Sequence, residues 1–299
     1  MMLGIGFLFA ILSLVCIGIY SVFLKKVVSK IGEYACALYS TGALAIVLVV
    51  VSILSTRLKM PSDFVTAAIA LGGLVGSFAF YLFYKSLHSG SASLVLSVTS
   101  MFIVWSYVVS CLIFGIRIGI LQAIALVVSI ISIILITMEK LSLPKVFDEE
   151  HIMLFIRSDL WSKGAGLALV ASFCFTILFI AAGYGSGNIG PHRSMLYLAV
   201  LIVFFLLFAF LGRSAKGLVS LPAKSERRYL WIGIASFCAA AVFFYFAIVY
   251  DSMSSVVHVV YAFPVVAATG SALLLKEKLK FRQYLGIVLL TVSLIMISF

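Results

Sequence analysis

Long apolar stretches free of Asp, Glu, Lys and Arg alternate along this chain with short charged connections. A helix needs roughly 20 apolar residues to cross the hydrocarbon core of a bilayer. Each stretch runs 17 to 23 residues and is continuously apolar rather than alternating, which favours helices over a closed barrel. We therefore predict ten transmembrane helices, at 3–24, 34–55, 64–84, 92–114, 118–138, 164–184, 194–212, 229–250, 253–275 and 283–299.

Composition supports this assignment. Hydrophobic residues make up 64% of the 299 positions and charged residues only 10%. A soluble domain keeps about a quarter of its residues charged, because it needs a polar exterior. We therefore expect an all-α integral membrane protein, a multi-pass protein of the cell membrane with the lipid bilayer as its solvent.

The net charge of +11 would by itself suggest nucleic acid as a partner, but the basic residues are confined to short loops between apolar stretches. Control of membrane topology explains such loops better than nucleic-acid binding does. The five cysteines stand singly inside apolar stretches, without a Cys-x-x-Cys pair. We therefore expect no metal site, cofactor or disulfide.

Residues 139–163 form the longest connection and include an acidic run at 148–150. This polar linker separates a first repeat, 1–138, from a second, 164–299, each with five predicted helices. An offset of 161 aligns four pairs of identical residues: Gln122 with Gln283, Ser93 with Ser254, Phe102 with Phe263, and Val104 with Val265. Because five is odd, the second repeat would be inverted relative to the first. Inverted repeats recur in transporters, with the substrate site at the repeat interface.

Basic residues are distributed unequally between the loops. Numbered from the N-terminus, the odd loops carry seventeen Lys and Arg residues and the even loops carry four. By the positive-inside rule the odd loops face the cytoplasm, so both termini would face outward.

The end of the chain carries the clearest local motif. It comprises Tyr261-Ala262-Phe263-Pro264, a small apolar stretch to Leu275, Lys276-Glu277-Lys278-Leu279, Gln283 and Gly286. This arrangement resembles the closing motif of the EamA family in the drug/metabolite transporter superfamily, with a Pro in helix nine, a Glu after a small-residue run and a Gly opening helix ten. Three segments of the first half resemble the family's first helix ending and its junction between helices three and four: Gly18 to Lys25, Tyr84-Lys85-Ser86-Leu87 and Ser91-Ala92-Ser93.

The resemblance implies alternating access through a central cavity lined by helices one, three, four, six, eight and nine. It implies gating or structural roles for Pro264, Glu277, Gly286 and Gly18. At the 161-residue offset, the first repeat has other residues where the second has Pro, Glu and Gly: Ile103, Ile116 and Ala125. Family members are commonly drawn with both termini in the cytoplasm, opposite to the orientation that the loop charges favour.

His258 is the one ionisable side chain well inside a predicted span, Tyr and Cys aside. A neutral imidazole can bind a polar substrate group, and its titration near neutral pH suits proton coupling. A hydrogen bond to a Ser or Tyr of another helix is the alternative. Tyrosine hydroxyls within spans are further substrate-binding candidates, although most such side chains pack or anchor at interfaces: Tyr20, Tyr81, Tyr107, Tyr245 and Tyr261.

Pro264 lies in the middle of the predicted span 253–275, where a proline frees a backbone carbonyl and kinks a helix. Because broken helices mark substrate sites in transporters, we expect a gating kink there, with a packing kink as the alternative. Glu277 is expected to form a loop ion pair with its neighbours Lys276 and Lys278, which an exposed loop makes weak.

No Asp or Glu lies inside a predicted span. Because a pump for lipophilic cations needs a buried carboxylate, we expect a small neutral, zwitterionic or anionic metabolite as substrate, such as an amino acid. We therefore predict a secondary transporter, working as an exporter, with protons as a candidate coupling ion. Two alternatives stay open: a lipid-carrier flippase on the same fold, and a membrane-embedded enzyme, which would need a cluster of His, Asp or Glu near a membrane face.

Overall fold

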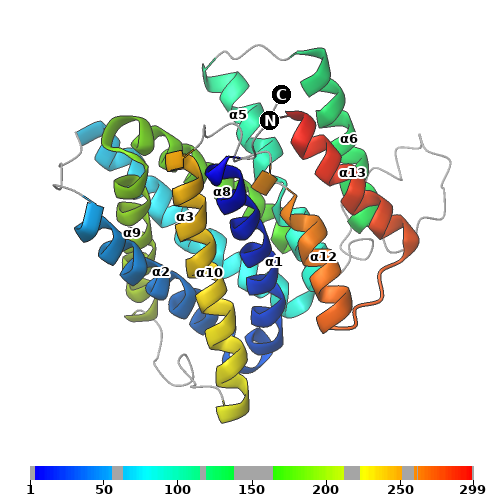
Figure 1. Ribbon diagram of the computed structural model, residues 1–299, viewed down its shortest axis with the longest axis horizontal. Helices are drawn as coiled ribbons and strands as arrows, with labels where there is room; N and C mark the ends of the chain where they lie inside the picture. The colour runs from blue at the N-terminus through cyan, green and yellow to red at the C-terminus, as the bar shows by residue number, and fades with distance from the viewer. Residues whose placement is uncertain are drawn as a thin grey trace.

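The computed structural model describes residues 4–55, 63–114, 119–137, 164–211, 223–250, 259–260 and 262–297, and all regular elements within these ranges are helices (Figure 1). The helices are α1 Ile5–Ile31, α2 Glu33–Ser55, α3 Asp63–Ser89, α4 Ala92–Thr99, α5 Phe102–Phe114, α6 Ile120–Thr137, α8 Ala165–Ile189, α9 Pro191–Leu211, α10 Lys224–Tyr250, α12 Phe263–Leu274 and α13 Phe281–Ile297. Among the described residues, six helical stretches are long and apolar enough to cross a membrane, one of them being Ala92–Val109, which covers α4 and the first part of α5, and four shorter helices are apolar. The predicted all-helical membrane class is therefore confirmed.

Several helices continue beyond the spans that the charge pattern predicted, and α1 and α3 are the examples that bear on the site. The α1 helix runs to Ile31 rather than to residue 24, and α3 runs to Ser89 rather than to residue 84. Lysines do not interrupt a helix; they mark where it leaves the apolar layer. The α1 helix ends instead at Gly32, whose φ of 84° closes the last turn by a bond from its N–H to the Val28 carbonyl.

One predicted span is two helices. The stretch 92–114 divides into α4 and α5, which meet at Ser100 and Met101. The charge pattern did not reveal this division, because neither half contains a charged residue.

The most extensive helix pairings are α1 with α10, α3 with α8, and α6 with α13. When the two halves are compared, α1 corresponds to α8 and α3 corresponds to α10. The pair α1 with α10 then corresponds to the pair α8 with α3, so the two pairings are reciprocal. The α6 and α13 helices lie side by side at one edge of the molecule, where they also contact α4, α5 and α12 (Figure 1). The main core cluster lies among α1, α3, α4 and α8, where Leu24, Tyr84, Leu87 and Val95 are fully buried.

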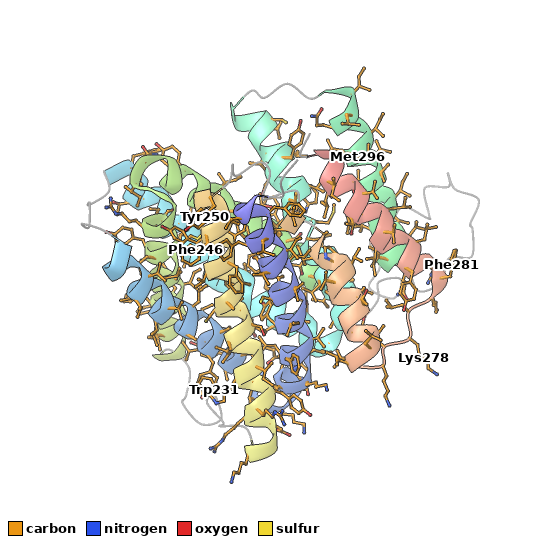
Figure 2. The ribbon with its side chains drawn as sticks, in the orientation of Figure 1. Trp231, Phe246, Tyr250, Lys278, Phe281 and Met296 are labelled. Atoms are coloured by element: carbon orange, nitrogen blue, oxygen red, sulfur yellow. The ribbon has the colours of Figure 1, made fainter. Side chains whose placement is uncertain are left out.

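The basic residues of several loops gather at one end of the molecule. There Lys30 pairs with Glu226, the Lys26 ammonium lies 4.8 Å from the Tyr229 ring centroid, and the His88 ring contacts Glu33. These contacts join the end of α1 to the start of α10, and the end of α3 to the start of α2. We call this region, formed by the ends of α1, α3 and α12 and the starts of α2, α4, α10 and α13, the basic end. Figure 2 shows Trp231 and Lys278 toward this end, and Tyr250 and Met296 toward the opposite one.

Candidate functional site

Two helix discontinuities occur at equivalent positions in the two halves of the chain. The first lies between α4 and α5, and α5 begins at Phe102. The second lies at Ala262, which forms a turn between the helical residues 259–260 and the start of α12 at Phe263. Phe102 and Phe263 are the residues that the 161-residue offset aligns, so the two breaks coincide in the repeat.

The hydrogen bonds at each break are those of a tightened turn. The Met101 N–H donates to the Val98 carbonyl and the Ile103 N–H donates to the Ser100 carbonyl, each at 3.1 Å, which are i to i−3 bonds. At the second break the Ala262 N–H donates to the Val259 carbonyl at 3.2 Å, with the same spacing. In both halves the chain therefore passes through one short turn before a new helix begins.

Pro264 does not lie in the middle of a helix. It occupies the first turn of α12, where a missing N–H removes no intrahelical bond and the fixed φ suits a helix start. The expected mid-span kink is thus a helix beginning. Ile103 stands at the matching position of α5, so the first break forms without proline.

Both breaks lie well away from the basic end. The α4 helix has 8 residues between the basic end and the first break, and α12 has 12 between the second break and the same end. At 1.5 Å per residue these lengths are about 12 and 18 Å. Since the hydrocarbon core of a bilayer is about 30 Å thick, a half-helix of this length would cover roughly half of it.

An aromatic cluster surrounds the first break. We use this name for Tyr20 of α1, Phe80 and Phe83 of α3, Phe102 of α5, Phe175 of α8 and Phe237 of α10. Its closest ring pair is Tyr20 with Phe237, at 4.8 Å between centroids, followed by Phe80 with Phe175 at 5.1 Å. Phe102 at the break lies 6.4 Å from Phe175. The cluster thus connects the two extensive helix pairs, α1 with α10 and α3 with α8.

The structure separates the tyrosines that the sequence singled out. Tyr20 is buried in the aromatic cluster, whereas Tyr81 lies with the Lys85 ammonium 5.8 Å from its ring centroid. Tyr107 is partly exposed on α5, and the Tyr245 ring lies beside Phe246 on α10. His258 and Tyr261 lie outside the described residues, so their roles stay predictions.

Tyr84 was not among the candidates, although its environment is more constrained than theirs. It is fully buried, and its hydroxyl donates to the Ser40 Oγ at 2.7 Å, joining α3 to α2. The sequence offered no signal for this bond, since both residues lie in apolar stretches beside many similar ones.

Gly18 and Gly286 lie where helices approach closely. A Cβ at Gly18 would be 2.5 Å from the Val266 Cγ1 of α12, and one at Gly286 would be 2.9 Å from the Ser132 carbonyl oxygen of α6. Glycine allows backbones to meet in this way within lipid. The contacts of these two residues are therefore those of helix packing.

The Glu277 carboxylate contacts a helix start rather than the neighbouring lysines. Its Oε1 accepts from the Ala92 N–H at 2.8 Å, and its Oε2 accepts from the Ser93 hydroxyl at 2.8 Å and from the Ser93 N–H at 3.3 Å. These groups form the first turn of α4, the end at which a helix favours negative charge. Glu277 thus links the connection between α12 and α13 to the broken helix of the first half.

A group of three or more His, Cys, Asp or Glu side chains that could hold a metal ion is not found among the described residues.

The model of the EamA-like transporter family matches the chain twice, over residues 4–138 and over residues 162–299. The chain belongs to the EamA-like transporter family. Membership confirms the resemblance inferred from the closing motif and places the protein among the multi-pass membrane transporters of the drug/metabolite transporter superfamily.

A solved structure titled "Crystal structure of protein" is similar over 96% of this chain and 97% of its own length, with a TM-score of 0.58 and 12% identity. This likeness extends to the fold alone. No curated protein sequence matches the chain.

Each EamA match contains one of the two breaks. The match over 4–138 contains the junction of α4 and α5, and the match over 162–299 contains the start of α12. The family's closing motif therefore supplies two structural elements here: Pro264 lies in the first turn of the half-helix α12, and Glu277 fixes the far end of that half-helix to α4.

Proposed function

We propose that this protein is a secondary transporter that moves a small polar metabolite by alternating access, with the substrate bound between the two helix breaks and the aromatic cluster. The observation that carries the proposal is the pair of breaks at equivalent positions of the two EamA matches. Irregular backbone near the middle of a membrane is tolerated only where protein buries it or a cavity exposes it. In transporters such discontinuous helices form substrate sites.

The direction of the half-helices supports an anionic or zwitterionic substrate. Both α5 and α12 begin at a break, so two helix N-termini lie near the middle of the membrane. The positive end of a helix dipole favours a carboxylate. An amino acid or a similar metabolite fits this arrangement, and the aromatic cluster supplies apolar faces for its side chain.

We further propose ten spans in two inverted five-helix repeats, with boundaries at 1–138 and 164–299 and the linker 139–163 between them. The reciprocal pairing of α1 with α10 and of α3 with α8 supports the repeat.

The basic end would face the cytoplasm of a cell-membrane protein, because basic loops are retained on that side. We propose export as the working direction. No contact among the described residues favours the flippase or the enzyme alternative.

Flux measurements in proteoliposomes test the transport proposal. The purified protein is reconstituted and loaded with unlabelled amino acids, and uptake of labelled ones is measured against empty liposomes. Phe237→Ala should reduce exchange about tenfold through loss of the aromatic contact with Tyr20. Phe208→Ala is the matched control, since this side chain is 68% exposed toward lipid. If no member of the panel exchanges faster than in empty liposomes, the substrate class is wrong.

Proton coupling is tested in the same vesicles with an imposed pH gradient. The gradient should accelerate flux of the wild-type protein, and His258→Gln should remove the acceleration while leaving exchange without a gradient intact. Acceleration that survives in His258→Gln would exclude this histidine as the coupling group.

A further inference from the structure

The α3–α4 junction at the basic end exposes two oppositely polarised helix ends. The α3 helix ends at Ser89 and α4 begins at Ala92, so the last carbonyls of one and the first N–H groups of the other lie within a few residues. Such groups have no partners within their own helices. The start of α8 is also close, since a Cβ at Gly164 would lie 2.6 Å from the Ser86 carbonyl oxygen.

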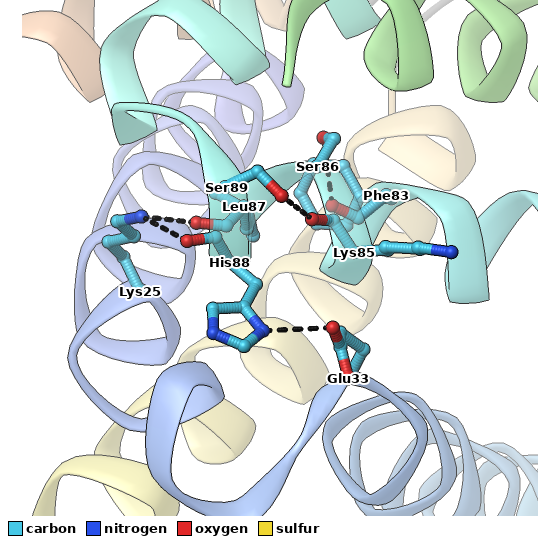
Figure 3. A network of polar contacts seen from close by, with 8 residues as sticks. All are labelled: Lys25, Glu33, Phe83, Lys85, Ser86, Leu87, His88 and Ser89. Carbon is cyan, nitrogen blue, oxygen red and sulfur yellow. Dashed lines mark hydrogen bonds and ion pairs between the residues drawn. The ribbon is translucent and has the colours of Figure 1, made fainter. Parts of the chain in front are cut away.

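Lys25 of α1 satisfies the carbonyl side of this junction. Its ammonium donates to the carbonyl oxygens of Leu87 and Gly90, and to that of His88 at 3.3 Å (Figure 3). A cation is stabilised at the C-terminal end of a helix, where the carbonyl dipoles point outward. Figure 3 also shows that the His88 ring turns toward Glu33, so the carbonyl groups remain available to Lys25.

Glu277 satisfies the amide side through its three bonds to Ala92 and Ser93. The junction is therefore held by a cation on the end of α3 and an anion on the start of α4. These two side chains come from positions 252 residues apart, 277 minus 25, so only the tertiary structure brings them together.

Both side chains cross the same boundary within the molecule. The α1 helix packs extensively on α10 and α12, and α3 packs extensively on α8, while α4 lies at the boundary and packs on both α8 and α12. Lys25 and Glu277 belong to the first set (α1, α10, α12 and the connection after α12), and their partners belong to the second set (α3, α4, α8). In contrast, the pair of Lys30 and Glu226 joins α1 to α10 within the first set.

We propose that Lys25 and Glu277 form a latch that holds the basic end closed, and that the transport cycle breaks it when that end opens. The proposal rests on the alternating access proposed above, which requires the two sets to separate at each end in turn. Charge-assisted bonds suit a latch because they are strong when formed and the freed charged groups are hydrated when the end opens.

Thiol labelling tests the latch without a known substrate. The five native cysteines are replaced by serine, and Ser97→Cys places a single thiol at a fully buried position one turn beyond Ser93. A membrane-impermeant maleimide is then applied to sealed vesicles from the side on which a separate Lys278→Cys variant is labelled. Loss of a charge-assisted bond by Glu277→Gln or Lys25→Gln should raise the labelling rate of the introduced thiol about tenfold.

Glu226→Gln is the matched control, since it removes a carboxylate at the same end but within the first set. Its labelling rate should equal that of the parent. Equal rates in Glu277→Gln, Lys25→Gln and Glu226→Gln would overturn the latch. The latch is also overturned if the labelling rate of the Lys25→Gln/Glu277→Gln double variant rises by the full product of the two single increases. If both side chains hold the same closure, the loss of either one already weakens it, and the increase in the double variant is smaller than that product.

Folding is followed by the melting temperature of each detergent-solubilised variant. Where Glu277→Gln does not melt cooperatively, Glu277→Asp, which keeps the charge on a shorter side chain, should also raise labelling, and an unchanged rate contradicts the latch. If the labelling rate depends on Glu277 but no flux is measured, the latch stands and the proposed substrate fails. Flux without such dependence would reject the latch alone.

Discussion

At the scale of single residues, partners across helices decide what a side chain does. Glu277 lies between two lysines in the sequence, and their proximity predicted a loop ion pair. The carboxylate instead accepts three bonds from the start of α4. Backbone N–H groups at a helix start are fixed in place, whereas a lysine must lose side-chain entropy to pair. The fixed donors therefore bind the carboxylate.

Tyr84 provides a test of buried polar contacts at this scale. Tyr84→Phe removes the hydroxyl that donates to Ser40 in the core between α3 and α2. We expect a loss of about 1 kcal/mol of stability, the net value of a buried hydrogen bond, seen as a lower melting temperature in detergent. Tyr250→Phe, at a ring that is 60% exposed, is the control. Equal melting temperatures for the two variants would show that the Ser40 bond contributes nothing.

At the scale of helices, small residues and helix starts set the architecture. Gly286 lets α13 approach α6, and the Ser129 and Ser293 hydroxyls meet across the same contact at 2.8 Å. Pro264 marks where α12 begins and Ile103 occupies the equivalent place in α5. The contact of α6 with α13 and the two breaks are thus element-level features that individual side chains permit.

The α6–α13 contact is sensitive to one added carbon. Gly286→Ala would place a Cβ 2.9 Å from the Ser132 carbonyl oxygen and 2.8 Å from the Ile136 Cγ1. Because the backbone oxygen cannot rotate away, we expect overpacking to cost about 1–3 kcal/mol and to lower the melting temperature. Gly166→Ala in α8, where a Cβ meets nothing within 4 Å, should not destabilise the protein. A stable Gly286→Ala variant would mean that the two helices move apart freely.

The first break should accept the proline that the second contains. Ile103→Pro places a proline at the second position of α5, as Pro264 is placed in α12. We expect a folded protein that loses no more than the one bond from the Ile103 N–H to the Ser100 carbonyl, about 1 kcal/mol, because a proline suits the start of a helix. Val108→Pro, in the middle of α5, should cost about 3 kcal/mol or more. If both variants melt alike, α4 and α5 act as one continuous helix.

At the scale of the whole molecule, charge and symmetry organise the chain. Four of the described helices have their basic ends on the same side of the molecule: α1, α3, α10 and α12, the last together with the connection that follows it. The unequal distribution of charge between the loops requires such a gathering. The two EamA matches and the reciprocal helix pairings divide the same chain into equivalent halves. The aromatic cluster lies where helices of both halves meet.

Orientation in the membrane is the prediction that belongs to this scale. If the basic end faces the cytoplasm, the end of α13 lies on the outer side, since Lys278 and Met296 occupy opposite ends (Figure 2). A reporter fused after Phe299 that is active only outside the cytoplasm should therefore be active, and a fluorescent protein that needs the cytoplasm should be dark. The reverse pattern would support the orientation that EamA proteins are commonly given.

The amino-acid sequence by itself determined the solvent, the helical class, the division at the midpoint and the family. Each of these depends on local composition or on a short motif such as the one from Tyr261 to Gly286. Burial in lipid imposes helices on any long apolar stretch, because its backbone groups have no other partners. These features therefore need no knowledge of which helices are neighbours.

Only the tertiary structure decided where helices break and which side chains meet. The ring pair of Tyr20 with Phe237 and the bonds of Lys25 and Glu277 join residues far apart in the sequence, and the division at Ser100 lies within a stretch without a charged residue. Apolar stretches of similar composition leave many pairings open, since lipid solvates each helix about as well as a neighbour does. Close packing, a few buried polar bonds and the charged helix ends select one arrangement, and these depend on the three-dimensional contacts.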